Sequence, residues 1–108
     1  MSLNLPKPIA AYLAAENGDD TEVLAQCFAN DAIIRDEGRK IAGLAVIKEW
    51  KAESKKKYQH TVEPLSFVQK EGKTVVMARV AGKFTGSPLD LQFVFSIKDG
   101  KIASLEVN

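Results

Sequence analysis

The chain has 108 residues, of which 45% are hydrophobic and 27% are charged, as in an ordinary globular protein. This length predicts a single domain over residues 1–108 that can bury a core without disulfides. A formal net charge of +1 gives no basis for nucleic-acid binding, and a single cysteine excludes an internal disulfide. No stretch approaches the roughly 20 apolar residues of a membrane span. We therefore expect a soluble cytoplasmic protein with neither a nucleic-acid nor a membrane partner.

The first part of the chain predicts two helices. Pro6 and Pro8 suit a helix start, because the first turn does not use the N–H donor that proline lacks. Asn17 and Gly18 are a stop signal for this helix. A second helix, with a buried stripe that includes Cys27, is expected to end at Phe28.

A short strand pair and a third helix are expected next. The strand Ala32–Arg35 runs into a turn at Asp36–Arg39, and Lys40–Ala42 forms the return strand. The third helix opens after Gly43, and its apolar side follows helical spacing at Leu44, Ile47, Trp50, Ser54 and Tyr58. Five lysines are predicted to form a mostly solvated face of this helix: Lys48, Lys51, Lys55, Lys56 and Lys57.

The second half predicts four strands joined as an antiparallel meander. Glycine-containing turns at Glu71–Lys73 and Asp99–Lys101 indicate hairpins. The strands are Thr61–Gln69, Thr74–Phe84, Leu89–Ile97 and Ile102–Val107. Helices that precede an antiparallel sheet favour an α+β fold, with the helices packed on one face of the sheet.

Several motifs in this order resemble the nuclear transport factor 2-like superfamily, in its SnoaL-like branch. They are Phe28–Ala32, the turn from Asp36 to Gly38, Gly43, Phe84–Pro88 and Asp99–Ile102. The resemblance implies a cone-shaped, cystatin-like fold in which three N-terminal helices pack on a curved antiparallel sheet around a cavity. It also implies either a small-molecule enzyme or a non-catalytic protein, because both occur on this fold.

The segment from Asp31 to Asp36 resembles the strand of ketosteroid isomerase that carries the catalytic base, with Asp36 at that position. Strand alternation places Asp36 on one face with Ala32 and Ile34, toward the expected cavity. Two features depart from the isomerase. The position of its donor tyrosine falls on Ala11, beside Tyr12, and that of its second aspartate falls at or beside Phe93. The isomerase reaction itself is therefore not expected.

Asp36 is the candidate catalytic residue, as a general base that takes a proton from a carbon next to a carbonyl group. The candidate ligand-binding residues are Tyr12, Ile34, Trp50, His60, Arg79 and Phe93. Each has a structural alternative: Asp36 as a turn residue, His60 at a sheet edge, Trp50 in the core, and Arg79 either paired with Asp36 or pointing outward. One histidine and one cysteine, far apart, exclude a recognisable zinc pattern, so we expect no metal and no cofactor.

Three classes of function remain open. The first is a cofactor-independent acid–base enzyme of isomerase, cyclase or dehydratase type that acts on a small carbonyl compound. The second is a non-catalytic binder of a small hydrophobic ligand, and the third is a dimerisation or protein-interaction module. Because the strand Thr74–Phe84 has apolar residues on both faces, we also expect a homodimer formed through the sheet.

Overall fold

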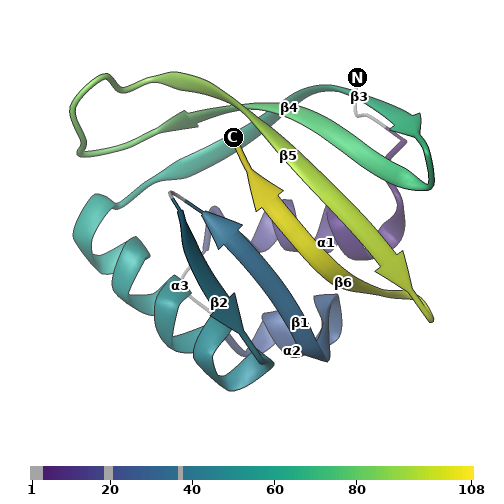
Figure 1. Ribbon diagram of the computed structural model, residues 1–108. Helices are drawn as coiled ribbons and strands as arrows, with labels where there is room; N and C mark the ends of the chain where they lie inside the picture. The colour runs from purple at the N-terminus through teal and green to yellow at the C-terminus, as the bar shows by residue number, and fades with distance from the viewer. Residues whose placement is uncertain (1–3, 19–20, 37) are drawn as a thin grey trace.

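The computed structural model describes residues 4–18, 21–36 and 38–108 (Figure 1). Helix α1 spans Lys7–Ala15, and a 3-10 turn over Thr21–Val23 leads into the short helix α2 at Leu24–Cys27. Helix α3 spans Leu44–Tyr58. Figure 1 shows the three helices on the same face of a single sheet. The predicted α+β cone, with helices on one side of a curved sheet, is confirmed.

The sheet has six strands in the order β2-β1-β6-β5-β4-β3. Their bounds are β1 Phe28–Asp36, β2 Arg39–Ala42, β3 Thr61–Lys70, β4 Lys73–Ala81, β5 Leu89–Lys98 and β6 Lys101–Val107. Strands β3 to β6 form the predicted meander, and β1 pairs antiparallel with β2. Strand β1 runs parallel to β6, so the expectation of a purely antiparallel sheet was incomplete.

The second helix is shorter than predicted and the first strand is longer. Phe28 was expected to end the helix, but its φ of −105° and ψ of 144° are extended and make it the first residue of β1. Its side chain is fully buried all the same. A buried apolar residue fits either a helix stripe or a strand, so periodicity alone did not separate the two. Glu37, in the predicted turn after β1, lies outside the described residues.

The two meander hairpins have the two-residue turns that the sequence indicates. Glu71 and Gly72 have φ of 52° and 77°, and Asp99 and Gly100 have φ of 55° and 80°. Two successive positive φ values match the right-handed twist of the flanking strands. The turns therefore fix the register of β3 with β4 and of β5 with β6, and with it the face on which each side chain lies.

The core lies between the helices and the inner face of the sheet. The Tyr12 ring packs edge-on against Phe28 and Phe95, with centroid distances of 5.2 and 5.8 Å. Cys27 is buried beside them as a small core residue. This packing ties α1 to both β1 and β5, and it places one end of α1 at the wall of the cavity described below.

The outer face of the sheet carries an apolar row. Val68, Val75 and Val94 lie directly opposite one another on β3, β4 and β5, and Met77 is next to Val75 on this face. Val68 is 58% exposed and Met77 is 37% exposed. This row is the surface that the predicted homodimer through the sheet would cover. The homodimer stays a prediction.

We expect a dimer mass by light scattering at micromolar concentration. Val75→Lys places a charge in the middle of the row and should shift the mass to that of a monomer while the circular dichroism spectrum is retained. A monomeric mass for the unmodified chain would contradict the prediction.

Candidate functional site

A cavity of about 420 Å³ opens between α1, α3 and the inner face of the sheet. One side of its wall is apolar, with side chains from β3 to β6: Val62, Val80, Leu89, Leu91, Phe93 and Val107. The other side carries ionisable groups from α1, β1, β2 and α3 and from the residues just after α1 and just before β3: Tyr12, Glu16, Asp36, Arg39, Lys51, Glu53, Lys57, Tyr58 and His60. Such a cavity is suited to a small molecule that is apolar at one end and polar at the other.

Asp36 lines this cavity at the last position of β1. Ala32 and Ile34 on the same face are fully buried, Arg35 on the other face is exposed, and Asp36 is half-buried. This is the alternation that the sequence predicts. Asp36 is also close enough to Tyr12 for its negative charge to contribute to a raised pKa of the phenol. A carboxylate and a phenol thus belong to one site.

Five predicted site residues line the cavity together: Tyr12, Asp36, Trp50, His60 and Phe93. They come from α1, β1, α3 and β5 and from the residue before β3, so the fold collects them from most of the chain. Their roles in binding or catalysis stay predictions. Tyr12 reaches the cavity although the position expected from the isomerase pattern is Ala11, because Tyr12 lies on the buried side of α1 with Ile9 and Leu13.

Two predicted site residues lie elsewhere. Ile34 is fully buried in the core and does not line the cavity. Arg79 is on the outer face of the sheet, where its Nε donates to Asp90 Oδ1 at 3.0 Å across β4 and β5. The prediction that Arg79 faces the cavity was wrong, because register places it on the same side as Val75 and Met77.

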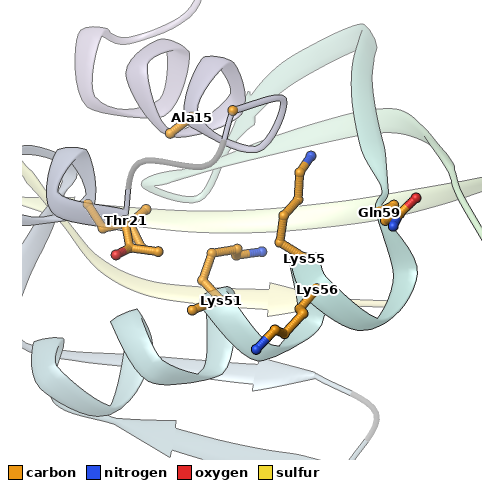
Figure 2. A pocket seen from close by; sticks show the side chains of 9 residues that line it. Ala15, Thr21, Lys51, Lys55, Lys56 and Gln59 are labelled. Carbon is orange, nitrogen blue, oxygen red and sulfur yellow. The ribbon is translucent and has the colours of Figure 1, made fainter.

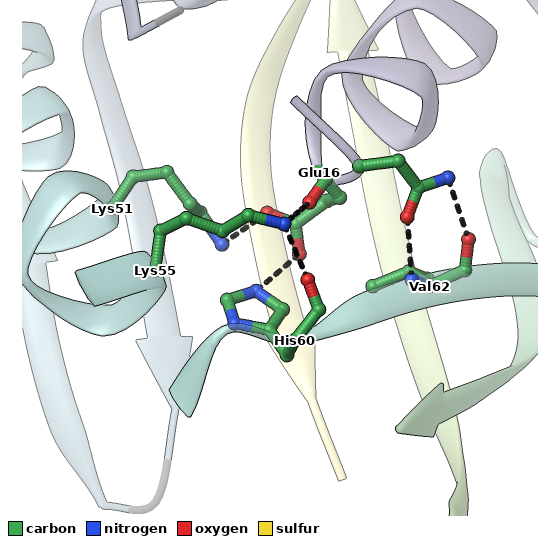
Figure 3. Close-up of polar contacts among 6 residues, drawn as sticks. Glu16, Lys51, Lys55, His60 and Val62 are labelled. Atoms are coloured by element: carbon green, nitrogen blue, oxygen red, sulfur yellow. Dashed lines mark hydrogen bonds and ion pairs between the residues drawn. The ribbon is translucent and has the colours of Figure 1, made fainter. Parts of the chain in front are cut away.

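A buried charged cluster at the cavity wall was not predicted. Glu16 follows α1 and is 4% exposed, and both Lys51 of α3 and His60 before β3 are 7% exposed. The Lys51 ammonium forms an ion pair with Glu16 Oε1, and His60 Nε2 lies 3.5 Å from Glu16 Oε2. Figure 3 shows Lys51 and His60 converging on the Glu16 carboxylate. Three elements therefore meet at one carboxylate.

The charges of this cluster support one another. Burial alone would raise the pKa of Glu16, but the positive charge of Lys51 and the contacts with His60 outweigh it and lower the pKa from 4.5 to about 2. Burial also raises the pKa of Tyr12 well above its usual value, and the negative charge and hydrogen bond of Glu16 add to that effect. Glu16 is therefore ionised at neutral pH, and Tyr12 beside it is a neutral phenol.

Two aromatic rings cover the Lys51 ammonium. Its Nζ lies 4.4 Å from the centroid of the Trp50 ring and 5.6 Å from that of Tyr12. An ammonium near ring faces is attracted to their negative quadrupole. Lys51 was predicted on the solvated side of the helix, and this was wrong. It follows Ile47 by one helical turn and shares its buried side, and Glu16 makes its burial possible.

Backbone contacts hold the cluster in place. Lys55 Nζ donates to the carbonyl oxygens of both Glu16 and His60, so it joins the end of α1 to the start of β3 (Figure 3). Asn17 reinforces the junction by pairing with both the N–H and the carbonyl of Val62. Gly82 passes so close that a Cβ there would lie 2.9 Å from the Cα of His60. The three elements are therefore fixed relative to one another.

A second pocket of about 540 Å³ lies on the other side of Lys51, between α3 and the segment after α1 (Figure 2). Lys51, Lys55 and Lys56 line it together with Thr21 and others. Figure 2 shows the Lys55 amine pointing toward the end of α1 and Lys56 pointing away from it. None of the seven predicted site residues lines this pocket, so the 420 Å³ cavity is the candidate site.

Two further features concern the described residues alone. Over 4–18, 21–36 and 38–108, no group of three or more histidine, cysteine, aspartate or glutamate side chains is arranged to hold a metal ion. In the same ranges, no helix is both long and apolar enough to cross a membrane.

The fold is that of the cone-shaped α+β domains, and the sequence places this chain in one family of that class. Residues 9–105 match the SnoaL-like domain family, and the chain belongs to it. No curated protein matches the sequence.

Solved structures agree with this assignment. A protein from Sinorhizobium meliloti that bears the name "putative polyketide cyclase" is 39% identical, with a TM-score of 0.94 over 100% of this chain and 99% of that one. A ketosteroid isomerase-like fold from Catenulispora acidiphila, in complex with trimethylamine, is 20% identical, with a TM-score of 0.84 over 97% and 86%. An epoxide hydrolase-like enzyme of Mycobacterium tuberculosis is 14% identical, with a TM-score of 0.78 over 94% and 75%. The last two show the fold alone.

Proposed function

We propose that this chain is a cofactor-independent acid–base enzyme that acts on a small carbonyl compound in the 420 Å³ cavity, with Asp36 as the general base. The observation that carries the proposal is that Asp36 and the Lys51 ammonium both line one cavity, whose wall on the side of β3 to β6 is apolar. The name of the 39% identical protein, "putative polyketide cyclase", supports the same class of chemistry.

The proposed step is proton abstraction next to a carbonyl group. A C–H bond of the substrate breaks, and its proton passes to the Asp36 carboxylate. The electron pair forms a C=C bond while the π electrons of the C=O bond move to oxygen, giving an enolate. Asp36, now a neutral acid, returns the proton to the same or another carbon. An apolar wall favours this step, because it excludes water from the developing charge.

The test is exchange of the α-proton of small cyclic ketones and 1,3-diketones for deuterium in D₂O, followed by proton NMR. We expect the unmodified chain to accelerate exchange and Asp36→Asn to abolish the acceleration, because asparagine keeps the shape but cannot accept the proton. Asp31→Asn removes the same charge from an exposed position of the same strand and should keep the acceleration.

Three other results would reject the proposal. If Asp36→Asn retains exchange, Asp36 is not the base. If the ketones bind without exchange, the chain is a non-catalytic binder. If they neither bind nor exchange, the interaction-module class is favoured instead.

A further inference from the structure

The proposed proton abstraction needs a group that takes up the negative charge on the substrate oxygen. Arg39 and Lys57 line the cavity but are exposed to water, so we compare the two buried donors Tyr12 and Lys51. Tyr12 is a neutral phenol, and the Glu16 carboxylate beside it competes for its hydroxyl proton. Lys51 carries a full positive charge, which interacts more strongly with an enolate oxygen than a neutral donor does.

The surroundings of Lys51 leave it able to bind an anion. An ammonium has three N–H donors. Among the described residues, Glu16 Oε1 is the one acceptor in contact with Lys51 Nζ, and the rings of Trp50 and Tyr12 supply no acceptor of comparable strength. Lys51 also lines the cavity itself. A buried cation with N–H donors to spare at a cavity wall is a site for a negatively charged oxygen.

We infer that Lys51 binds the substrate oxygen that becomes negative, and that Glu16 is the positioning residue that holds this ammonium in the cavity wall. The substrate class in this inference rests on the proposed function. The substrate carries a carbonyl oxygen directed at Lys51 and an acidic C–H bond directed at Asp36. Ketones and 1,3-dicarbonyl compounds that enolise meet both conditions.

A consequence of this arrangement is that Lys51 and Glu16 act in opposite directions on a bound anion. The ammonium attracts the oxygen, while the nearby carboxylate offsets part of that attraction. Removal of the Lys51 charge therefore disfavours an anion in the cavity, and removal of the Glu16 charge favours one. A pair that only stabilises the fold would have neither effect on a bound molecule.

The probe is 4-nitrophenol, whose ionised form is measured by its visible absorbance and resembles an enolate in carrying its charge on one oxygen. The pKa of the bound phenol is measured in an Asp36→Asn background, where the proposed base carries no charge. Relative to that background, Lys51→Met should raise the pKa of the bound probe by about one unit or more, the usual effect of losing an opposite charge at close range. Glu16→Gln should lower it.

Two further variants make the result decisive. Lys56→Met removes the same charge from the same helix, but its side chain lines the other pocket, so the probe's pKa should stay unchanged. The double variant Glu16→Gln/Lys51→Met leaves no uncompensated buried charge, so it supplies a folded protein without the ammonium even where Lys51→Met does not fold. Its bound probe should also have a raised pKa.

Equal pKa values in the Lys51→Met, double-variant and background proteins would overturn the inference, and so would failure of the probe to bind the Asp36→Asn protein. The measurement follows ionisation and not turnover. A shifted pKa without any deuterium exchange would therefore reject the proposed function while keeping Lys51 as the anion-binding group.

Discussion

Lys51→Met should lower the free energy of unfolding by about 3–5 kcal/mol, because it leaves the Glu16 carboxylate in the wall of the core without its cation. Glu16 is 4% exposed, so water does not replace the lost partner. His60 remains 3.5 Å from the carboxylate and compensates only in part. The change is measured by urea denaturation at neutral pH.

The matched control is Lys48→Met, one turn earlier on α3. Lys48 also pairs with a glutamate, Glu22, at 3.1 Å, but Glu22 is 77% exposed. Exposed pairs contribute about 0–1 kcal/mol, so this variant should unfold close to the unmodified chain. The double variant Glu16→Gln/Lys51→Met should regain most of the stability lost in Lys51→Met. A loss below 1 kcal/mol for Lys51→Met would show that the pair is not buried as described.

Acid should weaken the fold through Glu16, in a pH range set by its pKa. The pKa is about 2 in the folded protein and has the ordinary value of 4.5 in the unfolded chain, so the carboxylate stabilises the fold above pH 4.5. This contribution, about 3 kcal/mol, is lost as the pH falls from 4.5 toward 2 and Glu16 takes up a proton in both states.

The measurement is the difference in unfolding free energy between the unmodified chain and Glu16→Gln, taken at several pH values from 6 down. The difference removes the effect of carboxylates common to both proteins. On acidification, the unmodified chain should lose about 3 kcal/mol of unfolding free energy relative to Glu16→Gln. Glu49→Gln, at an exposed position of α3, should show no comparable shift. A difference that stays constant with pH would contradict an ionised, paired Glu16.

The fold was predictable because its local signals agree with its topology. The alternation in β5 gave the buried face that carries Phe93 and Phe95, and the turns at Gly72 and Gly100 gave the hairpins. The parallel pairing of β1 with β6 was not predictable in this way. It joins segments far apart in the chain, and the local sequence of neither strand indicates which strand it pairs with.

The residues that strands contribute to the candidate site were predictable from the sequence, and those that helices contribute were less so. Asp36 follows from alternation along β1. Lys51 occupies an apolar position of α3, one turn after Ile47, but a lysine is buried only where a partner exists. That partner, Glu16, lies just after another helix, α1. For Arg79, the partner considered from the sequence was Asp36. Its actual partner, Asp90, lies directly across the strand pair on the outer face of the sheet.

A crystal structure of the Asp36→Asn protein with 4-nitrophenol bound tests most directly that Asp36 and Lys51 act on one molecule in one cavity. The phenolate oxygen should lie within hydrogen-bond distance of Lys51 Nζ, about 2.7–3.2 Å, with the ring against Phe93 and one ring edge toward position 36. A probe in the pocket beside Lys55 and Lys56, or one whose oxygen points away from Lys51, would contradict the account.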